Sequence, residues 1–248
     1  MSTAPREPRR KRTVLVLVAI GAALGFAAGL KVARSQAEPA SARPPAVVAP
    51  PAVSATPSAL FIPRALTPIT VDGEPEDAAW TANELLRTPA YSERPYSDAR
   101  FTVRDGNLYL LLYAADEDLH AAHVSHDGDL WSGDAMRVVL SPRNDGREYV
   151  VDVSPAGTLS DYTRTAAGKD LSWESGAALG VDLDGTLDVT SDSDEEWVAE
   201  LSIPLSALGA LDPPATLGLR VERTDVSNGT TGPLLSWMPP GGRVTLAP

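Results

Sequence analysis

The stretch "ARFTVRDGNLYLLLYAAD" (residues 99–116) decides the fold class of this chain. Short runs of apolar and β-branched residues lie on both sides of the Asp105-Gly106-Asn107 cluster, and such runs are typical of partly buried strands. Asp-Gly pairs tolerate the left-handed backbone of a tight turn between two strands. The stretch therefore predicts a β-hairpin.

Similar runs recur through the rest of the chain, separated by turn residues. Residues 135–163 predict strands joined by turns at 144–146 and 155–157, and "GVDLDGTLDV" (180–189) predicts a hairpin around Asp184-Gly185. Residues 196–208 predict a strand that stops at Pro204, and residues 216–226 a late strand. Short strands without a long helical period predict an all-β, antiparallel sandwich of jelly-roll or immunoglobulin-like type.

The N-terminal part has a different composition. Residues 1–12 are basic, and residues 13–30 contain no charge for 18 positions, close to the length that crosses a bilayer. We therefore expect a cytoplasmic tail (1–12), a transmembrane signal anchor (13–33), a Pro/Ala-rich linker (34–64) and a domain (65–248). The basic tail predicts a single-pass protein of a bacterial inner membrane, whose domain lies in the periplasm or outside the cell. The alternative is cleavage near Ala37 and secretion.

Three glycines in the apolar segment suggest a partner. Gly21, Gly25 and Gly29 are spaced four apart, and this G-x-x-x-G pattern permits close pairing of membrane helices. Homodimerisation through this segment is one expectation. The alternative is that small residues are simply common in such helices.

Charge and cysteine content exclude several classes of function. Residues 1–36 carry a net charge of +6 and the remainder −18, so the domain lacks the basic face that nucleic acid requires. The chain has no cysteine, which excludes disulfides, thiolate catalysis and iron–sulfur clusters. No G-x-S-x-G, H-E-x-x-H or phosphate-loop motif is present, so we expect no enzyme activity.

A series of motifs in the domain resembles the carbohydrate-binding modules of family 9 and their DOMON-type relatives. The matching motifs, in chain order, are "ITVDGEPEDAAW", "NLYLLLYAADEDL", "LWSGDAMRVVLSP", "YVVDVSPAGTLSD", "DEEWVAELSIPLSAL", "LGLRVERTDV" and "LSWMPP". The resemblance covers residues 65–248 and implies a β-sandwich that grips sugar without catalysis, often with calcium. Trp80 and Trp197 fall in motifs whose rings are expected to fill the space between the sheets.

The resemblance also implies a sugar site. Its first clamp tryptophan matches Trp131, and its polar positions match Arg137, Asp152 and Glu222, where this chain departs from the family's residue types. "MPPGGRVTLAP" offers no second clamp tryptophan, and Trp173 is a candidate replacement. These departures leave open an alternative, in which the sandwich is a structural or protein-interaction domain.

Metal and haem are further alternatives. All three histidines fall in "HAAHVSHDGDLWSGD" (120–134), so His120, His123 and His126 are candidate ligands of a metal ion, against a simple solvated loop. Asp192 and Asp194 are candidate calcium ligands in an acidic run. Some DOMON-type sandwiches bind haem through methionine; the relevant Met136 is expected in the core.

Overall fold

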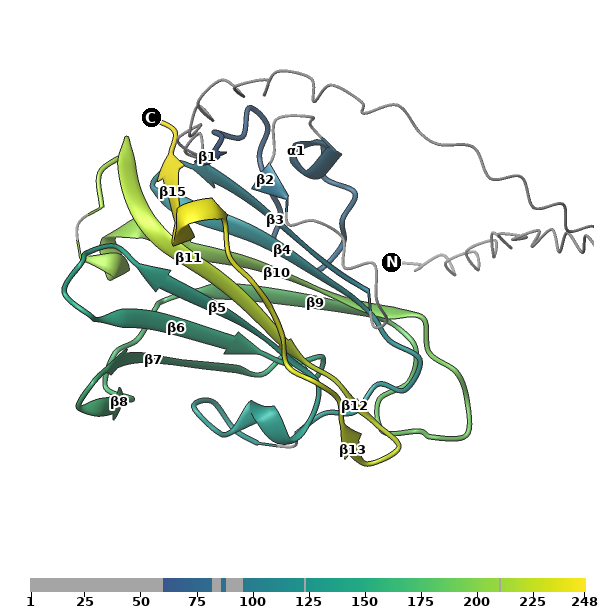
Figure 1. Ribbon diagram of the computed structural model, residues 1–248. Helices are drawn as coiled ribbons and strands as arrows, with labels where there is room; N and C mark the ends of the chain where they lie inside the picture. The colour runs from purple at the N-terminus through teal and green to yellow at the C-terminus, as the bar shows by residue number, and fades with distance from the viewer. Residues whose placement is uncertain (1–59, 82–85, 88–95, 123, 210) are drawn as a thin grey trace, which may run out of the picture. The chain divides into compact units, whose positions relative to one another are not determined.

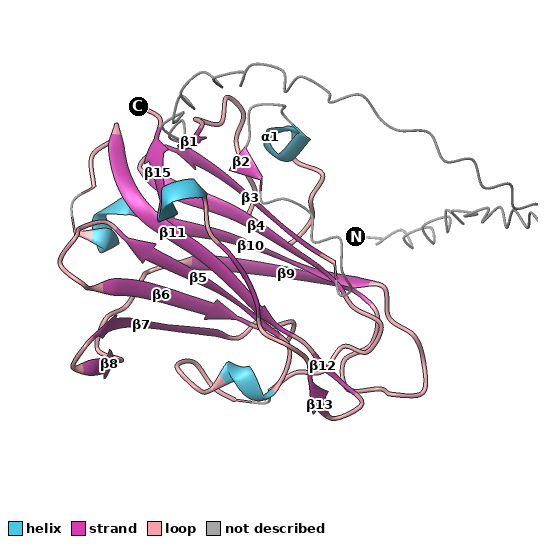
Figure 2. Cartoon of the chain, in the orientation of Figure 1, coloured by secondary structure: helices cyan, strands magenta, loops and turns pink. Residues whose placement is uncertain are grey.

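The computed structural model describes residues 60–81, 86–87, 96–122, 124–209 and 211–248, all within one compact unit. Its regular structure is almost entirely β-strand, arranged as two stacked sheets (Figures 1 and 2). The prediction of an all-β sandwich is confirmed.

The larger sheet has eight strands. Neighbouring strands in this sheet run antiparallel, except for the first two strands in the order given next, which run parallel. In spatial order the strands are β1 (Leu60–Ile62), β15 (Arg243–Leu246), β11 (Ala215–Thr224), β5 (Ala135–Ser141), β6 (Glu148–Val153), β7 (Leu159–Thr165) and β8 (Gly168–Asp170), with β14 (Leu235–Trp237) also paired to β11.

The smaller sheet has five antiparallel strands. They are β2 (Leu86–Arg87), β3 (Ser97–Arg104), β4 (Asn107–Ala115), β10 (Glu196–Pro204) and β9 (Ala178–Asp184). A separate ribbon joins β12 (Val226–Ser227) to β13 (Thr230–Thr231). The short helices are α1 (Ala78–Thr81), η1 (Leu130–Ser132), η2 (Leu205–Leu208) and η3 (Pro240–Gly242). None of these helices has the length and apolar character needed to cross a membrane.

The main core lies between the two sheets. Alternate residues of β4, such as Leu110 and Leu112, face alternate residues of β5, such as Val138 and Leu140, and all are fully buried. Burying a leucine or valine side chain contributes about 1.5–3 kcal/mol, so this layer supplies the main driving force for folding. The core residues also include Trp197 and Met136, as predicted.

The hairpin predicted from residues 99–116 is confirmed. β3 and β4 pair antiparallel across Asp105 and Gly106, whose φ angles of 47° and 78° are both left-handed. Asp and Gly tolerate this conformation, which gives a tight turn its twist.

The prediction of a hairpin around Asp184-Gly185 is wrong. β9 ends at Asp184 and pairs with β10, and no strand follows it directly. Asp194 folds back over this point, because its two carboxylate oxygens accept hydrogen bonds from the amides of Thr186 and Leu119, both at 2.7 Å. A Cβ atom on Gly185 would meet this carboxylate, so the glycine lets the loop close.

β1, whose residues fall within the range predicted as a linker, pairs with β15 of the eight-stranded sheet. One further expectation is corrected. Trp80 is fully buried but packs against Leu111 and Val198, on the outer face of the five-stranded sheet rather than between the sheets. The period of two along a strand explains this, because Leu111 points away from Leu110 and Leu112. The predicted tail, anchor and glycine motif, and the cleavage site near Ala37, lie outside the described residues.

Candidate functional site

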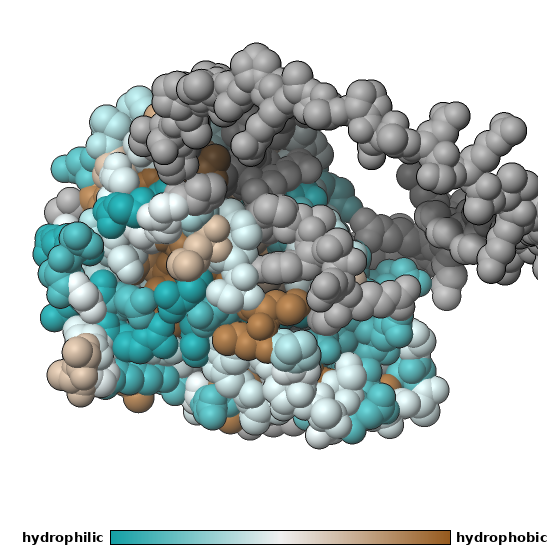
Figure 3. Space-filling model, in the orientation of Figure 1, coloured by the Kyte–Doolittle hydropathy of each residue, from teal (hydrophilic) through white to brown (hydrophobic). Residues whose placement is uncertain are grey.

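The candidate site lies on the outer face of the eight-stranded sheet. Glu222 on β11, Arg137 on β5 and Asp152 on β6 are direct neighbours in the strand register. Side chains at paired positions point to the same face, so strand pairing alone places these three groups in one row. Figure 3 shows hydrophilic residues gathered over β5 and β6.

Arg137 holds this row together. Its Nε and Nη2 donate to the two oxygens of Asp152 at 2.7 and 2.8 Å, a bidentate pair, and its Nη1 donates to Glu222 at 3.4 Å. Burial alone would lower the pKa of the Arg137 guanidinium, but the hydrogen bond and charge of Asp152 raise it. The guanidinium therefore stays charged and fixed in one orientation.

Trp131 is positioned above the row by the short helix η1. Asp129 caps the helix, and its side chain accepts a hydrogen bond from the backbone amide of Trp131 at 3.1 Å. The indole Nε1 donates to Asp152 at 3.0 Å, and the guanidinium carbon of Arg137 lies 4.1 Å from the ring centroid. These contacts fix the orientation of a ring that is still partly exposed.

An apolar layer supports the row from the side. Val139, Val150 and Tyr162 form a small buried cluster in the next register position of β5, β6 and β7. Tyr162 donates weakly to Asp152 at 3.5 Å, and Lys169 lies 3.8 Å from its ring centroid. Burial first, and then the charge of Asp152, raise the pKa of Tyr162 to about 12, so the phenol stays protonated. Sequence reasoning missed Tyr162, although its place two residues from the strand partner of Asp152 was a usable signal.

The structure brings Trp131, Arg137, Asp152 and Glu222 together, but it places Trp173 elsewhere. The Trp173 ring packs edge-on against Tyr149 at 5.0 Å between centroids, and its Nε1 donates to the carbonyl of Ala207 at 3.1 Å. Tyr149 lies three residues from Asp152 on β6, and therefore points to the opposite, inner face of the sheet.

His120 and His126 lie in a loop, and they contact different carboxylates. His120 Nδ1 lies 2.8 Å from Asp188, whereas His126 Nε2 lies 3.2 Å from Glu174. His123 lies outside the described residues.

Asp134, three residues after Trp131, fixes the far end of this loop. Its oxygens accept hydrogen bonds from the amides of His120 and Val226, both at 2.7 Å. Burial, followed by the neighbouring charge of Asp116, raises the pKa of Asp134 to about 8. This aspartate thus ties η1 to two distant segments.

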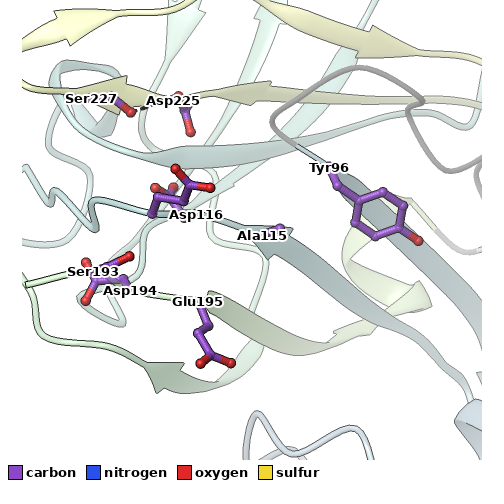
Figure 4. Close-up of a pocket in the computed structure, with 9 residues that line it drawn as sticks. Tyr96, Ala115, Asp116, Ser193, Asp194, Glu195, Asp225 and Ser227 are labelled. Atoms are coloured by element: carbon purple, nitrogen blue, oxygen red, sulfur yellow. Dashed lines mark hydrogen bonds between the residues drawn. The ribbon is translucent and has the colours of Figure 1, made fainter. Parts of the chain in front are cut away.

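An acidic pocket of about 560 Å³ opens beside this loop (Figure 4). Asp116 and Asp225 point toward one another in it, and Arg223 donates to both, at 3.0 and 2.8 Å. The calcium candidate Asp194 lines the same pocket, but both its oxygens already accept backbone hydrogen bonds. Asp192 is exposed. Calcium binding by this pair stays a prediction.

The fold resembles solved structures of carbohydrate-binding proteins. A proposed carbohydrate-binding protein from Bacteroides uniformis matches with a TM-score of 0.59 and 17% identity, covering 75% of this chain and 97% of that one. A family 9 carbohydrate-binding module from Caldicellulosiruptor kristjanssonii, solved with cellotriose, matches with a TM-score of 0.52 and 15% identity, covering 76% and 93%. No family model and no curated protein sequence matches the chain. The described part of the chain thus has the fold of the family 9 carbohydrate-binding modules.

Proposed function

We propose that this domain binds carbohydrate without chemical change, through the outer face of the eight-stranded sheet around Trp131. The observation that carries the proposal is the partly exposed indole ring, held in a fixed orientation by Asp152 and Arg137. An aromatic plane offers apolar contact to the C–H face of a sugar ring, and nearby charged groups can bond its hydroxyls. The fold match with a module solved in complex with cellotriose supports this choice of ligand class.

The binding mode follows from what is already paired. Asp152 accepts two bonds from Arg137 and one from Trp131, so it acts mainly as a support. Glu222 is the more accessible carboxylate, with 11% of its side chain exposed against 3% for Asp152. We therefore assign sugar contact to Trp131, Arg137 and Glu222, and positioning to Asp152.

The N-terminal segment completes the proposal. An uncharged run at residues 13–30 behind a basic tail would anchor the chain in the inner membrane, and a Pro/Ala-rich linker would hold the domain outside the cytoplasm. The reachable ligand would then be a cell-wall or environmental glycan. Protease accessibility of the domain in intact cells and in spheroplasts tests this orientation.

The binding experiment is a titration of the full chain with glucose, cello-oligosaccharides and peptidoglycan fragments, followed by calorimetry and tryptophan fluorescence. We expect binding that Trp131→Ala weakens by at least about tenfold, or about 1.4 kcal/mol. Trp173→Ala is the matched control, because that ring lies on the inner side of the sheet. Absence of heat at sugar concentrations of about 1 mM or above would contradict the proposal.

One observation favours a second candidate. The charged groups of the outer face pair with one another, and such a closed network also suits a structural or protein-interaction surface. A protein partner captured by the wild type, lost on Trp131→Ala and unaffected by competing sugar would favour this alternative.

A further inference from the structure

A second cluster of ligating side chains lies just before η1. His126 and Asp127 belong to the turn that precedes this helix, Asp161 to β7, and Glu174 to the loop between β8 and β9. One ligand atom from each of the four lies within 4.8 Å of the others. We propose that these four residues form a binding site for a divalent transition-metal ion, with Zn²⁺ as the ion that fits best.

Asp161 is the group that points to a ligand. It is 1% exposed, and its Oδ2 accepts a hydrogen bond from the amide of Ser175 at 2.6 Å. Its Oδ1 is buried and accepts no hydrogen bond from any described residue, yet it lies 3.7 Å from Nε2 of His126. A buried carboxylate oxygen without a hydrogen-bond donor is costly, and a bound cation at this position would remove that cost.

The distances suit a tetrahedral ion. Zn²⁺ lies about 2.0–2.1 Å from nitrogen and oxygen ligands, which places neighbouring ligand atoms of a tetrahedron about 3.3 Å apart. Nε2 of His126 lies 3.2 Å from Glu174 Oε2, and 3.7 Å from both Asp127 Oδ1 and Asp161 Oδ1. The three distances from His126 are thus close to the tetrahedral value, and the carboxylate oxygens lie within 4.8 Å of one another, so they would draw together on binding the ion.

The ligand types separate transition metals from calcium. Ca²⁺ and Mg²⁺ take oxygen ligands, whereas an imidazole nitrogen among carboxylates favours Zn²⁺ and its neighbours. Solvent reaches the site, since the side chains of His126 and Glu174 are 52% and 63% exposed while Asp161 is 2% exposed. The rigid buried ligand thus lies on a strand, and the two accessible ones lie on loops that can adjust.

A bound ion would link the loop that carries Trp131 to the sheet. His126 is five residues ahead of Trp131, and Asp161 is next to Tyr162, which contacts the supporting side of the row. The link would restrict the motion of η1 relative to β7. The proposal concerns metal binding itself and does not depend on sugar binding.

The test uses the full chain, without a polyhistidine tag, stripped of metal with EDTA and kept in detergent. Isothermal titration with ZnCl₂ should give one Zn²⁺ per chain, with a Kd of about 1 μM or below, and a raised melting temperature. His126→Ala and Glu174→Gln should each weaken binding by at least about tenfold. Both residues are largely exposed, so neither change threatens folding.

His120→Ala is the matched control, because His120 belongs to the same loop and pairs with Asp188 instead. Its Zn²⁺ affinity should equal that of the wild type. Three results would overturn the proposal: no Zn²⁺ binding at about 100 μM, unchanged affinity in His126→Ala, or displacement of Zn²⁺ by an equal concentration of Ca²⁺.

Discussion

Each outer face of the sandwich carries a tryptophan whose indole N–H donates to a carboxylate, but the surroundings of the two pairs differ. On the five-stranded sheet, the indole N–H of Trp80 donates to Glu200, and both residues are fully buried. On the eight-stranded sheet, the indole N–H of Trp131 donates to Asp152 at 3.0 Å, and the ring remains partly exposed.

The difference lies in what covers and what neutralises each pair. Glu200 also accepts hydrogen bonds from the amides of Asp72 and Gly73, both at 3.0 Å, so the N-terminal segment of the domain covers it. Asp152 is neutralised by the guanidinium of Arg137, and no segment of the described chain buries the neighbouring indole. The first pair therefore attaches the chain to its own sheet, whereas the second leaves an oriented aromatic ring partly exposed to solvent.

The largest expected effect separates the two tryptophans. Trp80→Ala should lower the free energy of unfolding by about 3–5 kcal/mol, because it removes a large buried ring and leaves Glu200 short of a donor. Trp131→Ala should lower it by about 1 kcal/mol, since this ring is only partly buried. Urea denaturation of both variants measures the difference. Equal losses of unfolding free energy would show that the two tryptophans contribute equally to stability.

The two carboxylates should differ in the same assay. Asp152→Asn leaves the largely buried guanidinium of Arg137 without its bidentate partner, and should cost about 3 kcal/mol. Glu200→Gln should cost about 1 kcal/mol, since its bonding partners in the described chain are neutral N–H groups. A greater loss for Glu200→Gln would mean that charge matters more on the covered face than on the open one.

Much of this comparison could be predicted from the sequence. The alternation in residues 99–116 and 135–163 predicted the strands. The motif order placed Arg137, Asp152 and Glu222 on strands, which the structure shows to be neighbours, and Trp131 just ahead of the first of them. Strand register then brings such residues into one row, so a correct fold prediction is enough to predict that these candidate residues lie together.

The other features depend on contacts between residues far apart in the sequence, and such contacts leave no periodic pattern in it. Trp80 packs on the outer face of the five-stranded sheet, where Glu200, 120 residues further on, accepts its indole N–H, and no local pattern encodes that contact. The loop after Asp184 resembled a hairpin because Asp-Gly is a good turn, but Asp194 holds the chain back instead. The four residues proposed to bind Zn²⁺ likewise come from three segments that meet only after folding.

A third carboxylate, Asp134, extends the comparison to pH. It accepts backbone N–H groups as Glu200 does, and burial raises its pKa to about 8, against about 3.9 in an unfolded chain. Between these values the folded state binds more protons, so stability should fall by a few kcal/mol as the pH rises from about 5 to 8.5. Asp116, whose pKa burial raises to about 6, acts in the same direction.

Denaturation midpoints of the wild type and of Asp134→Asn, measured at both pH values, test this. The variant should show a clearly flatter pH dependence, because it cannot ionise at this position. A wild type that becomes more stable toward pH 8.5 would mean that the two backbone hydrogen bonds keep Asp134 ionised.

The smallest expected effect concerns the rim of the open face. Arg220 donates to Glu222 at 2.7 Å and to Glu148 at 3.3 Å, and its side chain is 24% exposed. Arg220→Ala should cost about 0.5 kcal/mol, because partly exposed ion pairs gain little in water. The loss should shrink further in about 1 M salt, where the Debye length is about 3 Å. The cost of Trp80→Ala should not shrink under the same conditions, because it arises from burial rather than from charge.

A salt-insensitive loss of about 2 kcal/mol at Arg220 would contradict this view, because exposed pairs rarely contribute so much. The charged row would then be as much a part of the stabilising structure as the covered face, which would weaken the case for a ligand there.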